Sequence, residues 1–593
     1  MKLKHLYMLG AVALMTASCN EDRFLDLKPQ GSLNEDIMTS TEGADLLVNA
    51  AYAALGGPEG QSWSVWCHPT SNWTYGEVRS DNAYKGGGVG DLNEVHRMET
   101  FDMDATNGFL DSKWYHLYCS VQRCNSALRV LNAATDEQVN GRVSRIAEMK
   151  VLRAHYYFEL SRLFNKIPYF DENVEISQYP DIPNNEFTRD EILSMLAKEM
   201  LDAAEQLPAS QPEVGRIHKY IALAYAAKIK LYQAYQQDEI THAVTSINKE
   251  LLREVVSLCD QVTASNRYGL LDDFQGLDLV TNENGKESVF AIQYSMNDGT
   301  ESAGRINWSN LLNSPGGGSP YGGDGFFLPS QDLINAYQTD ANGLPDFNYQ
   351  SKSDYSWAVL NNGVYTLQNT TPNVDPRLDF VVGRPTITWK TYPDKPCEGW
   401  VRDKDTYGYN CAKRFWVSPE SSDMFNGWPW GASQLNWQII RYADILLWKA
   451  EALIELNEGN GLETARDLIN QIRNRARNSA YVKDFNDHSK YAANYLVNPY
   501  PADVWNQDYA RQALRWETRL EKALEGERFF DLVRWGIVET TMNNYITAES
   551  DNRIYYANAH FTGGKDEYYP VPNNQYGFSG GKYVQNPGYA PFN

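Results

Sequence analysis

The sequence predicts a mainly α-helical protein, a tetratricopeptide-like α-superhelix with a large irregular, loop-rich insertion and a few short strands. First, apolar residues recur at steps of three and four through most of the chain. Second, alanines recur where paired helices would cross, as in helical hairpins that stack into a superhelix. Third, Gly, Pro, Asn, Ser, Tyr and Trp dominate between about 265 and 435. One array with an insertion explains this pattern better than several separate domains.

The helical framework is expected in two blocks, about 39–263 and about 439–540. Helices are expected at 41–55, 110–132, 139–164, 188–206, 215–235, 248–262, 439–457, 462–477, 507–525 and 527–535. Thr188 and Glu191 have the spacing of a capping box, which marks the start of a helix. Residues 56–106 are rich in Gly, Trp, Asp and Asn, so we expect a long loop there.

The composition is that of a globular chain and excludes some classes of protein. Of the 593 residues, 42% are hydrophobic and 22% are charged, and the formal net charge is −23. This acidic balance argues against nucleic-acid binding, which requires a basic surface. Aromatic residues reach 13%, with 38 Tyr and 16 Trp. Such a chain can present flat rings with polar neighbours at its surface, as binding sites do.

The amino terminus has the pattern of a bacterial lipoprotein signal. Lys2 and Lys4 precede an apolar run, which ends in small residues directly before Cys19. The run is about a dozen residues long, too short to cross a bilayer. We therefore expect a signal peptide at 1–18, a lipidated Cys19 that anchors the protein, and a single domain at 19–593. Thr16 departs from the Leu that is usual three positions before the cysteine.

The chain lacks the local signatures of catalytic and cofactor sites. It contains no GxxxxGK[ST], GxSxG or HExxH motif, and no GxGxxG that opens a helix. No Cys/His cluster has the spacing of a zinc site. We expect a protein without catalytic residues, metal or cofactor, although a carboxylate pair at glycosidase spacing would leave no local trace.

Several segments, in order along nearly the whole chain, together resemble the RagB/SusD family of Bacteroidetes outer-membrane lipoproteins. They are Phe24-Leu25-Asp26 with Pro29, then the segments 152–160, 375–378, 440–447, 450–452, 525–536, 569–572 and 585–589. The acidic residues after Cys19 are similar to the signal that sends such lipoproteins to the cell surface. None of these segments is specific alone, but jointly they are highly specific.

The resemblance implies four tetratricopeptide-like units and an irregular region that carries the ligand surface. It implies a non-catalytic nutrient-binding protein, usually for glycans, lipid-anchored at the extracellular face of the outer membrane. Its partner would be a SusC-like TonB-dependent transporter, over whose mouth it sits as a lid. The charged residues of the shared segments are expected to order helix packing; they are Arg441, Asp444, Arg528, Asp531 and Arg534.

We chose candidate ligand residues by two criteria: a side chain that can contact a sugar, and a position in a loop that is expected to face the ligand. Sugar rings pack their C–H faces on aromatic rings, while their hydroxyls require Asn, Asp or Arg partners. In glycan-binding members, the aromatic platform comes from loops of the kind at 63–90 and 290–360. The candidates are Trp73, Asp81, Asn82, Tyr84, Trp308, Tyr321 and Trp357.

Three alternatives remain open at this stage. The chain could be a peptide-binding member of the same family, whose groove recognises an extended backbone. It could be a surface glycosidase, which product release from a polysaccharide would reveal. It could also be a structural lid without a ligand of its own.

Overall fold

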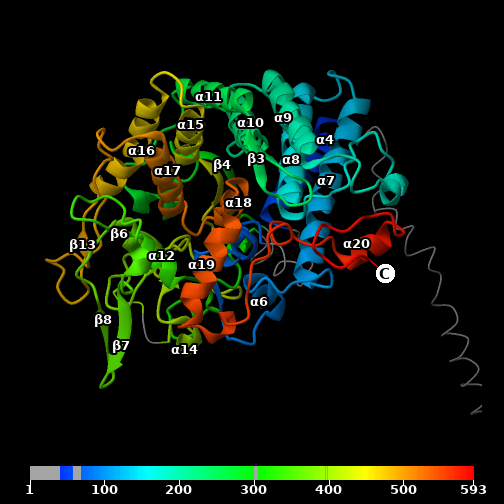
Figure 1. The fold of residues 1–593 in the computed structure, drawn as a ribbon. Coiled ribbons are helices and arrows are strands. Elements are labelled where there is room, and N and C mark those ends of the chain that lie inside the picture. Colours follow the sequence, from blue (N-terminus) through cyan, green and yellow to red (C-terminus); the bar gives the residue numbers. More distant parts are fainter. Residues whose placement is uncertain (1–39, 58–68, 300–304, 394–395, 397–398, 593) are drawn as a thin grey trace, which may run out of the picture.

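The computed structural model describes residues 40–57, 69–299, 305–393, 396 and 399–592 (Figure 1). The expected signal peptide and the expected lipidation site, Cys19, lie outside the described residues. The helices form an arch over the irregular region, with the early helices on one side and the later ones on the other (Figure 1).

The framework is a continuous stack of long helices. In packing order they are α4 (Thr41–Ala53), α7 (Gly108–Ala133), α8 (Arg142–Phe164), α9 (Arg189–Gln206), α10 (Lys219–Ala234), α11 (Lys249–Ala264), α15 (Tyr442–Leu456), α16 (Gly461–Asn478) and α17 (Gln507–Glu521). Each of these helices packs on the next one, so α11 meets α15 across the insertion between them. This arrangement confirms the predicted mainly α, tetratricopeptide-like fold.

Local sequence signals explain where these helices begin. Glu191 accepts a hydrogen bond from the backbone N–H of Thr188 at 2.8 Å, and the Thr188 hydroxyl accepts one from Glu191 N at 3.3 Å. The predicted capping box is therefore present and satisfies N–H groups that have no partner within the helix. Helix α8 is buried on every face from residue 151 to 164, which places it at the centre of the stack.

Two expectations about secondary structure were wrong. The stretch 56–106 is not a plain loop, because it contains a π-helix η2 (Trp73–Val78), a strand β1 (Ala83–Gly86) and a helix α6 (Asn93–Glu99). The segment expected to open a helix at 439 starts as strand β12 (Trp437–Arg441). It pairs with β4 (Ser288–Ile292), far away in sequence, so local periodicity could not indicate it.

Shorter elements complete the chain. The remaining helices are α12 (Gln331–Ala336), α13 (Arg377–Val381), α14 (Lys404–Tyr407), α18 (Arg528–Arg534), α19 (Val538–Ser550) and α20 (Asn573–Phe578). The 3₁₀ turns are η1 (Ala54–Gly56), η3 (Ile176–Asp181), η4 (Phe274–Asp278), η5 (Val280–Asn282), η6 (Trp308–Asn310), η7 (Tyr349–Ser351) and η8 (Ile554–Tyr556).

Small β-ladders pair short segments within the framework, within the irregular region and between distant parts of the chain. The other pairs are β1 with β5 (Phe326–Pro329), β2 (Tyr235–Gln237) with β3 (Val244–Ile247), β7 (Trp357–Asn361) with β8 (Val364–Gln368), and β10 (Val382–Gly383) with β11 (Cys411–Ala412). A three-stranded sheet has the order β13 (Asn494–Tyr495), β9 (Asn373–Val374), β6 (Gln338–Thr339). The β7–β8 hairpin projects from the body (Figure 1). A large hydrophobic cluster includes buried side chains of both the helices and the irregular region.

The charged residues of the shared segments hold helices and insertion together inside the protein. Arg441 is buried and contacts three carboxylates: Glu287 at 2.8 Å, Glu521 at 3.0 Å and Glu525 at 2.8 Å. We call these four residues the Arg441 cluster. The other expected packing charges are also paired: Asp444 with Lys522, Arg528 with Asp81, and Asp531 with Arg534. Their predicted structural role is confirmed.

Candidate functional site

Exposed tryptophans gather on a hairpin turn of the irregular region. Trp428 and Trp430 are 46% and 49% exposed, which is unusual for such large apolar side chains. Trp308, on η6, is half-buried, and its ring centre lies 5.9 Å from that of Trp428 with the planes inclined at 62°. We call Trp308, Trp428 and Trp430 the tryptophan shelf. Exposed rings of this kind offer an apolar surface to a ligand.

The backbone around Trp428 and Trp430 is held in a defined shape. Met424 and Ser433 pair as an antiparallel bridge at the base of the turn. The Ser314 hydroxyl donates to the carbonyl of Trp430 at 2.7 Å. Gly431 has a φ of +74°, and a Cβ at this position would lie 2.5 Å from Ser314 Cβ. Only glycine therefore allows this close approach, which fixes the two exposed rings relative to the body.

Asparagine side chains flank Trp308 on both sides in the chain. Asn307 donates through its backbone N–H to Ser433 O at 2.8 Å, which joins η6 to the hairpin. The side-chain amides of Asn310 and Asn313 are buried, and Asn310 Nδ2, Asn313 Oδ1 and Asn313 Nδ2 have no hydrogen-bond partner. Buried amide atoms without partners are rare in proteins and indicate bonds completed by water or by a ligand.

Three of the predicted aromatic ligand residues lie in the core instead. Trp73, Tyr84 and Tyr321 are at most 4% exposed. Trp73 packs on Phe327 with ring centres 5.7 Å apart. Tyr84 donates to Glu549 Oε2 at 2.8 Å, and Tyr321 donates to the carbonyl of Val417 at 2.7 Å. Their rings join the irregular region to the core, so the expectation that they face a ligand was wrong.

Asp81 and Asn82 are also internal. Arg528 Nε donates to Asp81 Oδ1 at 2.8 Å, and Arg519 Nη2 lies 3.2 Å from Asp81 Oδ2. Asn82 donates to Glu77 Oε2 and accepts from Arg519 Nε, both at 2.9 Å. These bonds use the polar groups that we expected a sugar to contact, which corrects the assignment.

Burial alone would raise the pKa of Asp81, but the guanidinium groups of Arg519 and Arg528 outweigh it and lower the pKa to about 2. The ion pairs therefore stabilise the fold above the ordinary pKa near 3.8, and this contribution is lost as the pH falls toward 2. We expect D81N to lower the free energy of unfolding by about 2 kcal/mol at neutral pH. Urea unfolding should show the difference in unfolding free energy between D81N and the unchanged protein vanishing between about pH 4 and pH 2. A difference that does not depend on pH would contradict this prediction.

The two other predicted residues are accessible. Trp308 belongs to the tryptophan shelf. Trp357, on β7 of the projecting hairpin, is 38% exposed and remains a predicted ligand residue. Sequence reasoning missed Trp428 and Trp430. The available signal was two tryptophans one residue apart, enclosed by Gly427 and Gly431.

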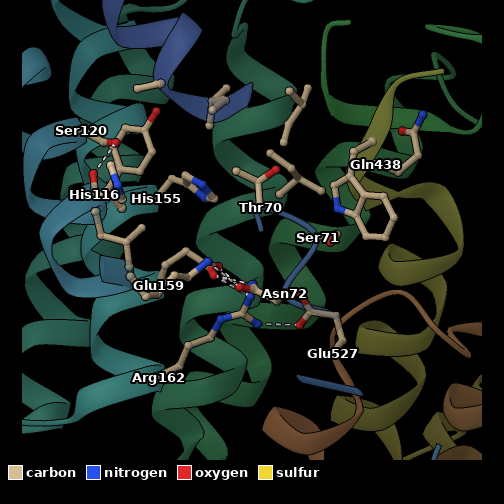
Figure 2. A pocket seen from close by; sticks show the side chains of 18 of the residues that line it. Thr70, Ser71, Asn72, His116, Ser120, His155, Glu159, Arg162, Gln438 and Glu527 are labelled. Carbon is tan, nitrogen blue, oxygen red and sulfur yellow. Dashed lines mark hydrogen bonds and ion pairs between the residues drawn. The ribbon is translucent and has the colours of Figure 1, made fainter. Parts of the chain in front are cut away.

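A second candidate is a polar cavity between α7, α8 and β12. Figure 2 shows Asn72, Glu159, Arg162 and Glu527 linked along its lower wall. Asn72 donates to Glu159 at 2.7 Å, and Arg162 donates to Glu527 at 2.7 Å. The cavity holds about 70 Å³, less than the ~150 Å³ that benzene requires in a protein interior. It suits a few water molecules and is too small for a sugar ring. Burial lowers the pKa of His155, which faces this space, to about 4.

In the part of the chain that the structure describes, no group of three or more His, Cys, Asp or Glu is placed to hold a metal ion. None of the described helices has an apolar stretch long enough to cross a bilayer.

The fold defines a class: a tetratricopeptide-like helical protein whose irregular insertion exposes tryptophans. The family model described as "SusD family" matches residues 286–589, and the one described as "Starch-binding associating with outer membrane" matches residues 23–231. The chain belongs to the SusD/RagB family. It is 22% identical over 552 residues to a SusD-like protein of Bacteroides ovatus, covering 89% of this chain and 82% of that protein.

Solved structures share the fold at low sequence identity. A SusD homologue from Bacteroides thetaiotaomicron is 17% identical with a TM-score of 0.68, covering 94% of this chain and 99% of that one. A laminarin-binding SusD-like protein is 20% identical with a TM-score of 0.63, covering 93% and 100%. Surface glycan-binding protein A from Bacteroides thetaiotaomicron, in complex with laminarihexaose, is 18% identical with a TM-score of 0.61, covering 92% and 99%.

Proposed function

We propose that this protein binds a glycan on the tryptophan shelf and acts by capture rather than by catalysis. The observation that carries the proposal is that Trp428, half exposed on a fixed hairpin, lies against Trp308, and that Trp430, also half exposed, follows two residues later on the same hairpin. Pyranose C–H faces pack on such rings, while hydroxyls bond to nearby amides. Two structurally similar proteins support this ligand class: a laminarin-binding SusD-like protein, and a surface glycan-binding protein in complex with laminarihexaose.

The expected setting of this binding is the outer membrane. We propose that Cys19 carries the lipid anchor, that the protein faces the cell exterior, and that it passes its ligand to a SusC-like TonB-dependent transporter. The description of the family model that matches residues 23–231 supports association with the outer membrane. Two or more acyl chains would make the attachment stable.

Native affinity electrophoresis of the full chain in detergent tests glycan capture. Gels containing laminarin, starch or other neutral and acidic polysaccharides would be compared with gels without polysaccharide. We expect one class of polysaccharide to slow the protein relative to a non-binding reference protein. A set of short oligosaccharides, tested by calorimetry, covers ligands that a gel cannot report. Absence of binding in both assays would overturn the proposal.

A further inference from the structure

A second, larger cavity lies outside the irregular region and shares no residue with the tryptophan shelf. It is half open to solvent and is lined by the turn between β2 and β3, the start of α19, and the C-terminal segments 563–567 and 587–588. Its volume is about 540 Å³, within the ~300–1,000 Å³ typical of small-molecule sites. A single sugar ring would fit this space.

Glycine backbone forms much of the wall. Gly536, Gly563, Gly564 and Gly588 line the cavity. At Gly563 a Cβ would lie 2.7 Å from Glu539 Oε2, so a side chain there would displace this carboxylate. Gly564 has a φ of +76°, a conformation that other residues rarely adopt. The glycines thus keep the cavity open and bring peptide groups next to the space.

Two carboxylates line the cavity, and two consecutive backbone N–H groups bind them. The N–H of Gly563 donates to Glu539 Oε1 at 3.4 Å, and the N–H of the next residue, Gly564, donates to Glu567 Oε1 at 3.2 Å. Neither lysine nor arginine is among the residues that line the cavity. Glu539 and Glu567 are therefore the acidic groups of a lining that contains no lysine or arginine.

Two buried polar atoms at this cavity have no hydrogen-bond partner. Glu567 is 7% exposed, and its Oε2 accepts no hydrogen bond. His242 is 2% exposed, and its Nε2 is likewise without a partner. Burial raises the pKa of Glu567 to about 7 and lowers the pKa of His242 to about 4, so the imidazole is neutral at neutral pH. With a pKa near 7, Glu567 exchanges its proton readily at neutral pH, and an ammonium group beside it would favour the charged carboxylate.

We propose that this cavity is a binding site for a small organic cation of the size of one sugar ring, an amino sugar with a free ammonium group. The ammonium group would lie between Glu539 and Glu567, where charge-assisted hydrogen bonds form. Sugar hydroxyls would face the glycine peptide groups and His242. This site is independent of glycan binding on the tryptophan shelf.

Calorimetry of the full chain in detergent with D-glucosamine tests the proposal at about pH 7, where an amino group with a pKa of about 8 is mostly protonated and Glu567 is partly ionised. D-glucose, of the same shape without the charge, is the comparison ligand. We expect glucosamine to bind at least about tenfold more tightly than glucose, a difference of about 1.4 kcal/mol. Equal binding of both sugars, or binding of neither, would overturn the site.

Two variants test whether glucosamine binds in this cavity. E539Q removes one charge at an exposed position, and G563A displaces the same carboxylate; both should weaken glucosamine binding at least about tenfold. E463Q is the matched control, because Glu463 occupies the first turn of α16 as Glu539 occupies that of α19. Circular dichroism confirms that each variant is folded. Unchanged affinity in both variants, or loss of affinity on replacing Trp428 and Trp430, would contradict the assignment.

Discussion

Replacement of Trp428 and Trp430 together by alanine should remove measurable glycan binding and leave the fold intact. Aromatic anchors at the centre of an interface typically contribute about 2 kcal/mol or more each, which is about 30-fold in affinity. Two such losses lower affinity about 1,000-fold. Both side chains are half exposed at the tip of a turn, so their loss removes little from the core. Affinity electrophoresis in the polysaccharide that slows the unchanged protein measures the effect.

Two single variants serve as comparisons for that experiment. F578A removes an exposed aromatic side chain on α20, away from the shelf, and should bind normally. W357A tests the remaining ligand residue predicted on the β7–β8 hairpin. Full retention of binding by the double variant would show that the shelf is not the site, and loss of binding in W357A alone would move the site to the hairpin.

Replacement of Arg441 by methionine should destabilise the protein by about 3–5 kcal/mol, the usual effect of breaking a buried ion pair. Methionine keeps much of the side-chain volume, but it leaves the carboxylates of Glu287, Glu521 and Glu525 without their shared partner inside the protein. Burial raises the pKa of the Glu521 carboxyl, but Arg475 and Arg441 together lower it to about 2, so it stays charged at neutral pH. Urea unfolding, followed by tryptophan fluorescence, measures the change in the free energy of unfolding.

An exposed arginine provides the matched control for R441M. Arg253 pairs with Glu250 and Glu458 at the surface, where water already solvates all three groups. We expect R253M to unfold at nearly the same urea concentration as the unchanged protein, since exposed ion pairs contribute little. If R253M and R441M lowered the free energy of unfolding equally, the burial of Arg441 would not be the reason that its ion pairs stabilise the fold.

The helical framework could be predicted because its signals are local. Apolar periodicity and the Thr188 capping box lie within single helices, and the observed helices agree with these predictions to within a few residues at their ends. Strand β12 could not be predicted in this way, since its partner β4 lies in another part of the chain. Apolar periodicity predicts single helices but not how they stack. The stacking into tetratricopeptide-like units was predicted from the family resemblance.

The site was harder to predict because exposure depends on distant partners. Asp81 and Asn82 have the chemistry of ligand residues, but Arg519, more than four hundred positions away, binds both of them. Trp73 is likewise covered by Phe327 of the insertion. No local pattern distinguishes such an internal contact from an external one. Trp428 and Trp430 lay outside the loops in which aromatic residues were sought, although the glycines around them mark a turn.

The paired base of the tryptophan hairpin has a consequence for how this fold can change its ligand. The chain enters and leaves the turn at one bridge, between Met424 and Ser433, and the tip is attached to the body by the Ser314 hydroxyl. Apart from Gly431, the residues between the bridge positions can therefore be exchanged as a cassette without shifting the register of any framework helix. Grafting tips of other lengths and ring placements onto this base offers a route to receptors with chosen specificities on one unchanged scaffold.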